Sequence, residues 1–408
     1  MDVEDVRTIG LAIWRVRDDR GKSLRVVAGL AGMSKDTLNR IERGLLSPTL
    51  SQILALAEVL QISVSELTRL PVPAPANGHT DSTTVAIGRA LDAIEASYPG
   101  GLVLPVAVLR ERVAQIHAQG RAVRFAEVAT DLPALIRDLH TTLTTGADHG
   151  EVLDLAVYLH VHVTRMWLLR AGAPDHLIRR VVFLALRLAQ ERDEVGTLAV
   201  AGFSVADILI AGGALVELGR ATLGSLTLPP VTAGTAGFVA VVTACHAIGA
   251  VLDGRPGDAV APMDAAAEIA GRFDVDSLAS VSEPTDAGMD RFVFGSVDAG
   301  SAQMLLALEA NEPDRAVSIG QNVNPDRHPL PVARTQYWIH YGRALSQLRG
   351  RRDDAVRALR TAEKIFPTMV LREPRVRDTL AVLLRHSRRG SSTDEVLRGM
   401  ARRAGLLV

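Results

Sequence analysis

A shortage of cysteine is the first limit that the sequence sets. Cys245 is the only cysteine in 408 residues, so no disulfide forms within the chain. The first ten residues, MDVEDVRTIG, lack the basic and then apolar layout of a secretion signal. The most membrane-like stretch, Val195 to Leu218, carries Asp207 and several glycines and has no flanking aromatic belt. We therefore expect a cytoplasmic protein with a buried helix in that stretch.

Signatures of catalysis and metal binding are also missing. No Gly-rich loop follows a predicted strand, and neither a Gly-x-Ser-x-Gly elbow nor an HExxH pair occurs. His160 and His162 are two positions apart and Cys245 directly precedes His246, so neither pair converges on a metal ion from one helix. We expect no enzyme, no cofactor and no metal site, and we interpret Cys245 as a small core residue.

Positive charge is scarce as lysine and common as arginine. Lysine occurs only at Lys22, Lys35 and Lys364, and the formal net charge is −1. Such a balance excludes a protein that coats nucleic acid indiscriminately, because that binding depends on neutralising phosphates and releasing counterions. The arginine-rich segment 343–403 is interpreted as a solvated helical face, with an auxiliary DNA contact as the alternative.

A proline-rich stretch divides the chain. In PVPAPANGHTDSTT, residues 71–84, three prolines alternate with small residues, which favours an extended linker. It separates a first domain, residues 1–70, from a longer one, residues 85–408. The chain exceeds the size at which one core keeps growing, and no strand alternation persists on either side. An all-α fold of two domains is predicted.

A weak internal repeat predicts stacked helical hairpins in the second domain. Its residues fall at the offsets where a tetratricopeptide unit uses Gly for the turn, small residues for helix contact and Pro to end the second helix. One copy comprises Gly350, Ala355, Leu359, Ala362 and Pro367, and another comprises Gly254, Ala259, Met263 and Ala266. Ala316 marks a weaker copy between them. We expect an irregular tetratricopeptide-like α-solenoid.

The passage that carries most information about function is residues 22–67. Ser23 and Ser34 each precede a helical pattern, and a serine oxygen there satisfies the first-turn amides. Gly32 permits a tight turn between the two helices. Leu38 and Ile41 are three positions apart and predict the buried face of the second helix. The pattern is that of a helix-turn-helix.

The outward-facing residues of the second helix have the chemistry that reads DNA bases. Lysine and arginine donate to guanine, asparagine pairs with adenine and aspartate accepts from cytosine, and the helix N-terminus enters the major groove first. The expected base readers are Lys35, Asp36 and Asn39, and Arg40 reads a base or binds a phosphate. The expected backbone anchors are Ser23, Arg25, Arg43 and Thr49, and Ser34 and Thr37 complete the predicted DNA-binding set. The alternative is that these polar residues only keep a small bundle soluble.

These residues resemble the DNA-binding domain of the xenobiotic-response-element family, the Cro and lambda-repressor type. The runs SLRVVAGLAGMSKDTLNRIERG and SPTLSQILALAEVLQISVSEL match its helices 2 to 5, which implies a five-helix domain. Two positions depart from the pattern. Leu24 replaces a common glutamine that contacts DNA, and Val26 replaces the glutamate of a Ser-x-x-Glu capping box.

The rest of the chain resembles, more loosely, the helical-repeat regions of large actinobacterial regulators of this type. The runs GRRDDAVRALRTAEKIFP and REPRVRDTLAVLLRHSRRGSSTDEVLRGMARRAGL carry the resemblance. More distant relatives with this layout include peptide-responsive quorum-sensing regulators, whose repeat domain binds a short signalling peptide. The resemblance implies a domain for effector binding and dimerisation.

Two groups of residues are candidates for that effector site. Tyr158, His162 and Arg165 fall on one face of a helix and suit an anionic ligand or a peptide carboxylate. Tyr337 and Tyr341 form a second pair one turn apart. The alternatives are a polar helix edge for the first group and aromatic packing between repeats for the second.

The sequence thus predicts a dimeric transcription regulator. Two heads about 34 Å apart double the contact with an operator in double-stranded DNA. The repeat domain is expected to sense a peptide, a small molecule or a protein, and to supply most of the dimer contact. The alternative is an interaction scaffold that its helix-turn-helix tethers to DNA.

Overall fold

The computed structural model describes residues 9–10, 13–14, 16–18, 20–43, 45–60, 62, 78–146, 148–213, 215–273, 286–385 and 392–406. These residues form helices, turns and loops, and none of them is in a β-strand. The all-α prediction is therefore confirmed for the described part of the chain. Contacts divide the chain into one unit of Met1–Pro75 with Leu371–Val408, and a second unit of Ala76–Val370.

The first unit contains the helix-turn-helix elements and two helices from the C-terminal end. Its described helices are α2 (Leu24–Leu30), α3 (Lys35–Glu42), α4 (Leu50–Val59), α22 (Pro374–Arg385) and α23 (Ser392–Arg403). Described residues between 9 and 18 are also helical. The fifth helix expected by resemblance, in residues 63–70, lies outside the described residues.

A compact apolar core fixes α2, α3 and α4 against one another. Val27 and Ala28 of α2, Leu38 and Ile41 of α3, and Leu56 of α4 are each at most 1% exposed. Residues three or four positions apart share a helix face, so this spacing gives each short helix one apolar side. The positions expected to be buried in α3 are confirmed.

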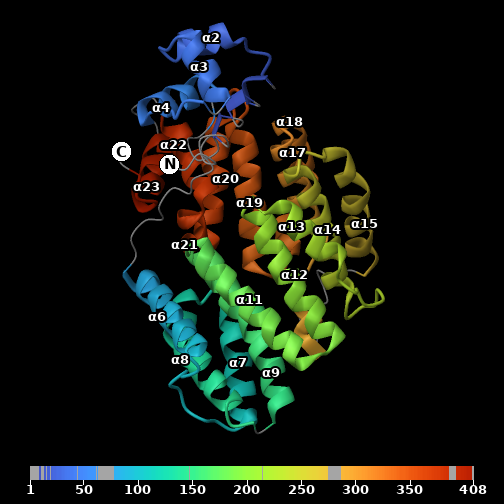
Figure 1. Cartoon of the computed structure of the whole chain (residues 1–408). Helices are drawn as coiled ribbons and strands as arrows, with labels where there is room; N and C mark the ends of the chain where they lie inside the picture. Colours follow the sequence, from blue (N-terminus) through green and yellow to red (C-terminus); the bar gives the residue numbers. More distant parts are fainter. Residues whose placement is uncertain are drawn as a thin grey trace. The chain divides into compact units, whose positions relative to one another are not determined.

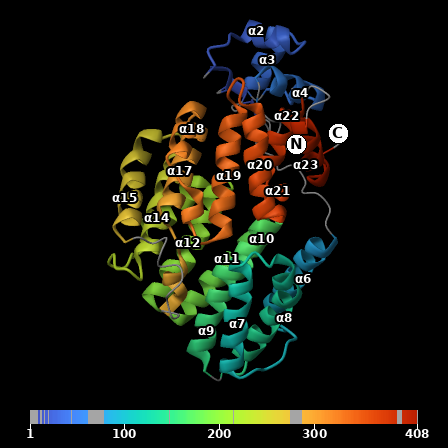
Figure 2. The same ribbon diagram turned by 180° about the vertical axis from the view of Figure 1, so that it is seen from behind.

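The second unit is a series of helices that pack on their neighbours in the chain (Figures 1 and 2). Its first part comprises α6 (Gly78–Glu95), α7 (Val106–Arg121), α8 (Phe125–Leu143), α9 (His149–Tyr158), the π-helix η1 (Leu159–Thr164), α10 (Arg165–Ala171) and α11 (Asp175–Arg192). Next come α12 (Val195–Ala211), α13 (Val216–Gly224), α14 (Ala236–Leu252), the 3-10 helix η2 (Pro256–Ala259), α15 (Val260–Arg272) and the 3-10 helix η3 (Asp286–Arg291). The last part comprises α17 (Ser296–Glu309), α18 (Pro313–Gln321), the 3-10 helix η4 (Pro325–Arg327), α19 (Pro331–Ser346) and α20 (Arg352–Ile365). Helix α21 (Pro367–Arg372) crosses the boundary between the units.

The three expected repeat copies correspond to three helical hairpins. Gly254 and Gly350 have φ of 76° and 75° and lie in the turns that precede α15 and α20. Ala266 of α15, Ala316 of α18 and Ala362 of α20 are fully buried where these helices meet their partners α14, α17 and α19. Small residues at these positions let two helices approach closely.

The segment 71–84 differs from the expected linker in its second half, because α6 begins at Gly78. Thr83 is only 5% exposed, and its hydroxyl donates to the carbonyl of Ala129 in α8 at 3.4 Å. Pro133, four residues after Ala129, has no N–H to give that carbonyl. The prolines and small residues of this segment predict a linker, whereas Thr83 satisfies a buried carbonyl.

The C-terminal boundary also differs from the expectation that residues 85–408 form one domain. Leu371–Val408 clusters with the N-terminal residues. The guanidinium of Arg377 in α22 donates to the carbonyl of Ala404 at 3.0 Å, which joins α22 to the end of α23. Part of the arginine-rich segment is thereby held inside this helix pair.

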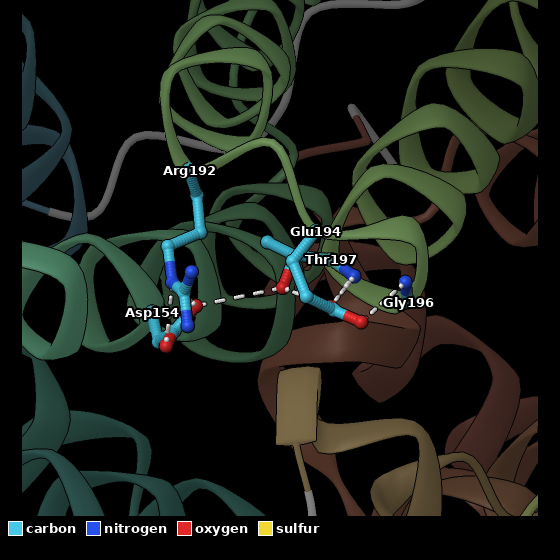
Figure 3. Close-up of polar contacts among 5 residues, drawn as sticks. All are labelled: Asp154, Arg192, Glu194, Gly196 and Thr197. Carbon is cyan, nitrogen blue, oxygen red and sulfur yellow. Dashed lines mark hydrogen bonds and ion pairs between the residues drawn. The ribbon is translucent and has the colours of Figure 1, made fainter.

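Polar caps connect α9, α11 and α12 (Figure 3). The carboxylate of Glu194 accepts from the backbone N–H groups of Gly196 at 3.0 Å and Thr197 at 2.7 Å, at the start of α12. Arg192, at the end of α11, contacts Asp154 of α9 at 3.0 Å. Burial raises the pKa of Glu194, but these hydrogen bonds outweigh it and leave the pKa lowered.

Two long apolar stretches are part of the core. The stretch Val195 to Leu218 is not one helix, because α12 ends at Ala211 and α13 starts at Val216. Its α12 part is largely buried, and Cys245 in α14 is buried as expected. A different run, His149–Ala171, has the length and composition of a membrane span, and 67% of its most apolar 18 residues are buried in the protein.

Candidate nucleic-acid interface and ligand cavity

Two serine caps and one glycine turn set the position of α3. The hydroxyl of Ser23 accepts from Val26 N at 3.3 Å, and that of Ser34 accepts from Thr37 N at 3.0 Å. Gly32 has φ of 68°, a conformation that side chains other than glycine rarely adopt. Ser23 caps α2 without the glutamate that Val26 replaces, so this departure leaves the helix start intact.

The polar face of α3 points away from the core of its own domain. Lys35, Asp36 and Arg40 are exposed and Asn39 is partly exposed. Arg43, also exposed, is the C-cap residue of the helix. Within the described part of the chain, none of the four charged side chains among them forms an ion pair.

The other predicted DNA-contact residues lie around the ends of the helices. Arg25 is exposed in the first turn of α2. Thr37 is partly buried, and its hydroxyl lies 2.9 Å from that of Ser34. Thr49 caps α4 in a reciprocal box in which Thr49 N donates to the Gln52 side chain at 2.9 Å. Ser34, Thr37 and Thr49 thus have structural hydrogen bonds, and their DNA contacts remain predictions.

A buried ion pair joins the end of α3 to the helical residues that precede α2, and the sequence does not indicate it. The Arg17 guanidinium contacts both carboxylate oxygens of Glu42, at 2.7 and 3.0 Å, and also donates to the carbonyl of Lys22 at 2.9 Å. The two side chains are 10% and 4% exposed. The hydrogen bond to Glu42 raises the pKa of Arg17 despite its desolvation. Only the tertiary fold brings together residues 25 positions apart, so no local spacing marks them.

The second unit contains a cavity of about 410 Å³. Its walls come from α7, η1, α10, α12, α14, α17 and α19, from the end of η3 with the residues after it, and from residues just before α19. A side lobe of about 50 Å³ shares His117, Arg121, His162 and Arg170 with it. Four arginines line the main cavity: Arg121, Arg165, Arg170 and Arg291.

The first predicted effector group lies at this cavity, although not as a simple helix face. His162 and Arg165 line the cavity, and Tyr158 lies just behind it with its hydroxyl 2.7 Å from His117 Nδ1. A π-helix has more residues per turn than an α-helix, so the segment Leu159–Thr164 changes the direction of Arg165 relative to Tyr158. Arg165 is 5% exposed. Its guanidinium contacts Asp207 at 2.5 Å.

The second predicted group is not at the cavity. Tyr337 and Tyr341 stack with ring centroids 5.8 Å apart, and Tyr337 donates to the Gly320 carbonyl at 2.8 Å. Both tyrosines are on α19, so this stacking lies within one helix, and the hydrogen bond of Tyr337 joins α19 to α18. Gln336 and His340, on the same helix α19, line the cavity instead.

Desolvation lowers the pKa values of the basic groups around the cavity. Desolvation, with the positive charges of Arg121, Arg291 and Arg170, lowers the pKa of His117 to about 3, so this ring is neutral at physiological pH. Desolvation and the charge of Arg165 lower the pKa of Arg170 to about 10, which still leaves its guanidinium charged. The cavity therefore holds fixed arginine charges beside a neutral imidazole.

Comparison with solved structures found two similar chains. The crystal structure of PlcR from Bacillus thuringiensis in complex with the peptide PapR7 and DNA is 12% identical and covers 88% of this chain and 99% of that chain, with a TM-score of 0.31. The apo form of the competence regulator ComR from Streptococcus vestibularis is 13% identical and covers 98% and 99%, with a TM-score of 0.21. Structural similarity at TM-scores of 0.31 and 0.21 supports no inference about function.

Comparison with curated proteins found no match. The scan against family models matched residues 9–70 to a helix-turn-helix domain. This span contains α2, α3 and α4 with their shared core. The N-terminal part of the chain is a helix-turn-helix domain, as its sequence predicts.

Proposed function

We propose that this protein is a sequence-specific transcription regulator that reads an operator in double-stranded DNA with α3. The observation that carries the proposal is the outward polar face of α3, with Lys35, Asp36 and Arg40 exposed around the partly exposed Asn39. A helix of this kind places lysine, arginine and asparagine donors against base edges in the major groove. A cytoplasmic location follows from the proposed DNA target.

The finer features of the proposal come from the sequence. They are a head of the Cro and lambda-repressor type, a tetratricopeptide-like second unit that responds to an effector, and a homodimer that spans two half-sites. The cavity in the second unit supports effector sensing over the alternative of a scaffold, because a lined cavity suits a ligand better than a protein surface.

Selection of bound duplexes from a random-sequence pool tests the DNA-reading role. Lys35→Ala and Asn39→Ala should each relax the preference at one base position and cost about 1–3 kcal/mol on the selected duplex. Arg25→Ala should weaken binding to all sequences alike, because a phosphate contact carries no sequence information. Lys364→Ala, an exposed change in α20, is the control.

The possible outcomes separate the roles of these side chains. If Lys35→Ala, Asn39→Ala and Arg25→Ala lose equal affinity for selected and random DNA, α3 does not read bases. If the unmodified protein selects no sequence at all, the regulator proposal fails.

Sedimentation measures the proposed dimer directly. The full-length protein should sediment at twice the monomer mass at micromolar concentration, alone or on the selected duplex. A monomer under both conditions would remove dimerisation from the proposal and leave the DNA-reading role of α3 standing.

A further inference from the structure

We propose that the cavity of the second unit binds an apolar monocarboxylate whose carboxylate is held by Arg170. The inference deepens the proposed effector response and rests on the proposed function only for its effect on DNA binding. The binding site itself stands on the geometry of the residues Ala76–Val370.

Arg170 is a partly buried cation without a counter-ion in the described part of the chain. Among the described residues, no carboxylate lies within ion-pair distance of its guanidinium, and its buried Nε has no hydrogen-bond partner. The charged neighbour that shifts its pKa is another cation, Arg165, and the ring of Phe366 lies 6.0 Å away. A buried charge that lacks a partner is costly, so an anion that supplies one binds favourably.

The other ionic groups of the cavity do not compensate Arg170. Asp207 is engaged with Arg165 at 2.5 Å. Asp298, the other carboxylate in the lining, accepts from Gly295 N at 2.9 Å and lies 3.0 Å from His328. Arg291, also in the wall, is engaged with Asp290 at 3.2 Å.

The rest of the wall is suited to an apolar body. Its apolar side chains include Met166, Leu169, Phe203, Phe292, Leu305 and Val332. A volume of about 410 Å³ falls within the range of small-molecule sites, roughly 300–1,000 Å³. The ligand that matches these walls has one charged end and one hydrocarbon or aryl end.

A carboxylate fits this arrangement better than a phosphate. The planar guanidinium donates two parallel hydrogen bonds to one carboxylate. Arg165 pairs with Asp207 at 2.5 Å, and Arg291 pairs with Asp290 at 3.2 Å. A dianion at Arg170 would therefore bring in more negative charge than this guanidinium offsets. We therefore assign the site to a monoanion.

Competition on the full-length protein tests the assignment. The fluorophore anilinonaphthalene sulfonate, itself an apolar anion, reports occupancy, and decanoate and decanol are the matched competitors with and without charge. Decanoate should displace the fluorophore at a concentration at least about tenfold lower than decanol, which is about 1.4 kcal/mol. Equal displacement by the acid and the alcohol would overturn the proposal.

Two variants locate the binding. Arg170→Met keeps the length of the side chain and removes the charge, so the preference for decanoate over decanol should disappear. Removing a partly buried charge that has no ion-pair partner should not lower the melting temperature, so a folding defect is separable from a binding defect. Arg187→Met, an exposed arginine on α11 outside the cavity lining, is the control and should bind as the unmodified protein does. If Arg170→Met retains the preference for decanoate, Arg170 is not the anchor.

Two further comparisons test whether the carboxylate belongs to a peptide or to a small acid, and whether its binding changes the affinity for DNA. An acetylated Leu-Leu-Phe tripeptide with a free C-terminus, compared with its carboxamide, tests whether the site takes a peptide end. Stronger competition by the peptide acid than by decanoate assigns the carboxylate to a peptide, and the reverse assigns it to a small acid. If decanoate binds through Arg170 and leaves affinity for the selected duplex unchanged, the site stands and its regulatory role fails.

Discussion

At the scale of single residues, the ion pair of Arg17 and Glu42 stabilises the packing of α3 in the helix-turn-helix domain. The pair is bidentate and nearly inaccessible to water. Removing one partner leaves the other charge buried without compensation, which typically costs about 3–5 kcal/mol. We predict that Glu42→Leu lowers the stability of the helix-turn-helix domain by that amount, measured by urea denaturation of the full-length protein.

The double variant Arg17→Met with Glu42→Leu is the control for this prediction. Replacing both charges by apolar side chains of similar size removes the uncompensated charge and should recover most of the lost stability. If the double variant is as unstable as the single one, packing rather than charge explains the loss.

Residue-scale prediction from sequence succeeds where the cause is local. Spacing alone places Leu38 and Ile41 in the core, and the amides that follow Ser23 and Ser34 identify these serines as caps. The partner of Glu42 is not predictable, because it lies 25 residues away and meets Glu42 only after α3 folds against the preceding helical residues.

At the scale of elements, the N-cap of α12 makes stability depend on pH. The pKa of Glu194 is lowered in the folded protein. The ionised carboxylate therefore stabilises the fold above the ordinary pKa of 4.5, and this stabilisation is lost as the pH falls below 4.5 and through the lowered pKa. We predict that Glu194→Ala lowers the stability of the second unit by about 1 kcal/mol at pH 7. Thermal melts at several pH values should show the difference from the unmodified protein shrinking below pH 4.5.

Glu268→Ala is the matched change for this experiment, since Glu268 is exposed in α15 and has no ion pair among the described residues. It should leave the melting temperature unchanged at each pH. A Glu194→Ala deficit that persists undiminished at low pH would show that the cap depends on side-chain volume and not on charge.

Close packing of two helix backbones explains a glycine that local sequence patterns do not single out. A Cβ on Gly10 would lie 2.2 Å from the carbonyl oxygen of Ile41, in α3. We predict that Gly10→Ala destabilises the domain by about 1–3 kcal/mol and weakens DNA binding, because α3 must shift. Denaturation and duplex affinity, measured together, test this.

Gly29 gives the opposite expectation and serves as the control. It lies within α2 and is exposed, and a Cβ added there would meet no atom within 4 Å. Gly29→Ala should raise stability by about 0.5–1 kcal/mol, since alanine loses less backbone freedom in a helix. Equal effects of the two substitutions would contradict the close approach at Gly10.

Elements are less predictable at their ends and at irregularities. The alternation of prolines and small residues in 71–84 predicts an extended linker and so places the start of α6 too late, although Thr83 satisfies the carbonyl that Pro133 leaves without an N–H donor. The π-helical segment Leu159–Thr164 displaces the helix periodicity on which the grouping of Tyr158, His162 and Arg165 depends. Both features depend on tertiary partners that spacing does not encode.

At the scale of the whole molecule, the chain enters and leaves its second unit through connections at Pro75–Ala76 and Val370–Leu371. Both ends of the chain therefore contribute to the first unit. The grouping of Leu371–Val408 with the helix-turn-helix residues is hidden from sequence reasoning, because an amphipathic helix near a terminus carries no mark of which core buries it.

This connectivity predicts different outcomes for two truncations. A chain of residues 76–370 keeps the cores formed by residues of α6–α17 and should unfold cooperatively, with anilinonaphthalene sulfonate bound as in the full-length protein. A chain of residues 1–370 removes the buried side chains of Val376, Leu380, Leu397 and Met400 from the first unit. It should lose affinity for the selected duplex while retaining the unfolding transition of the second unit. Far-ultraviolet circular dichroism in urea and duplex binding measure the two effects, and unchanged duplex affinity in the 1–370 chain would show that the helix-turn-helix domain stands without α22 and α23.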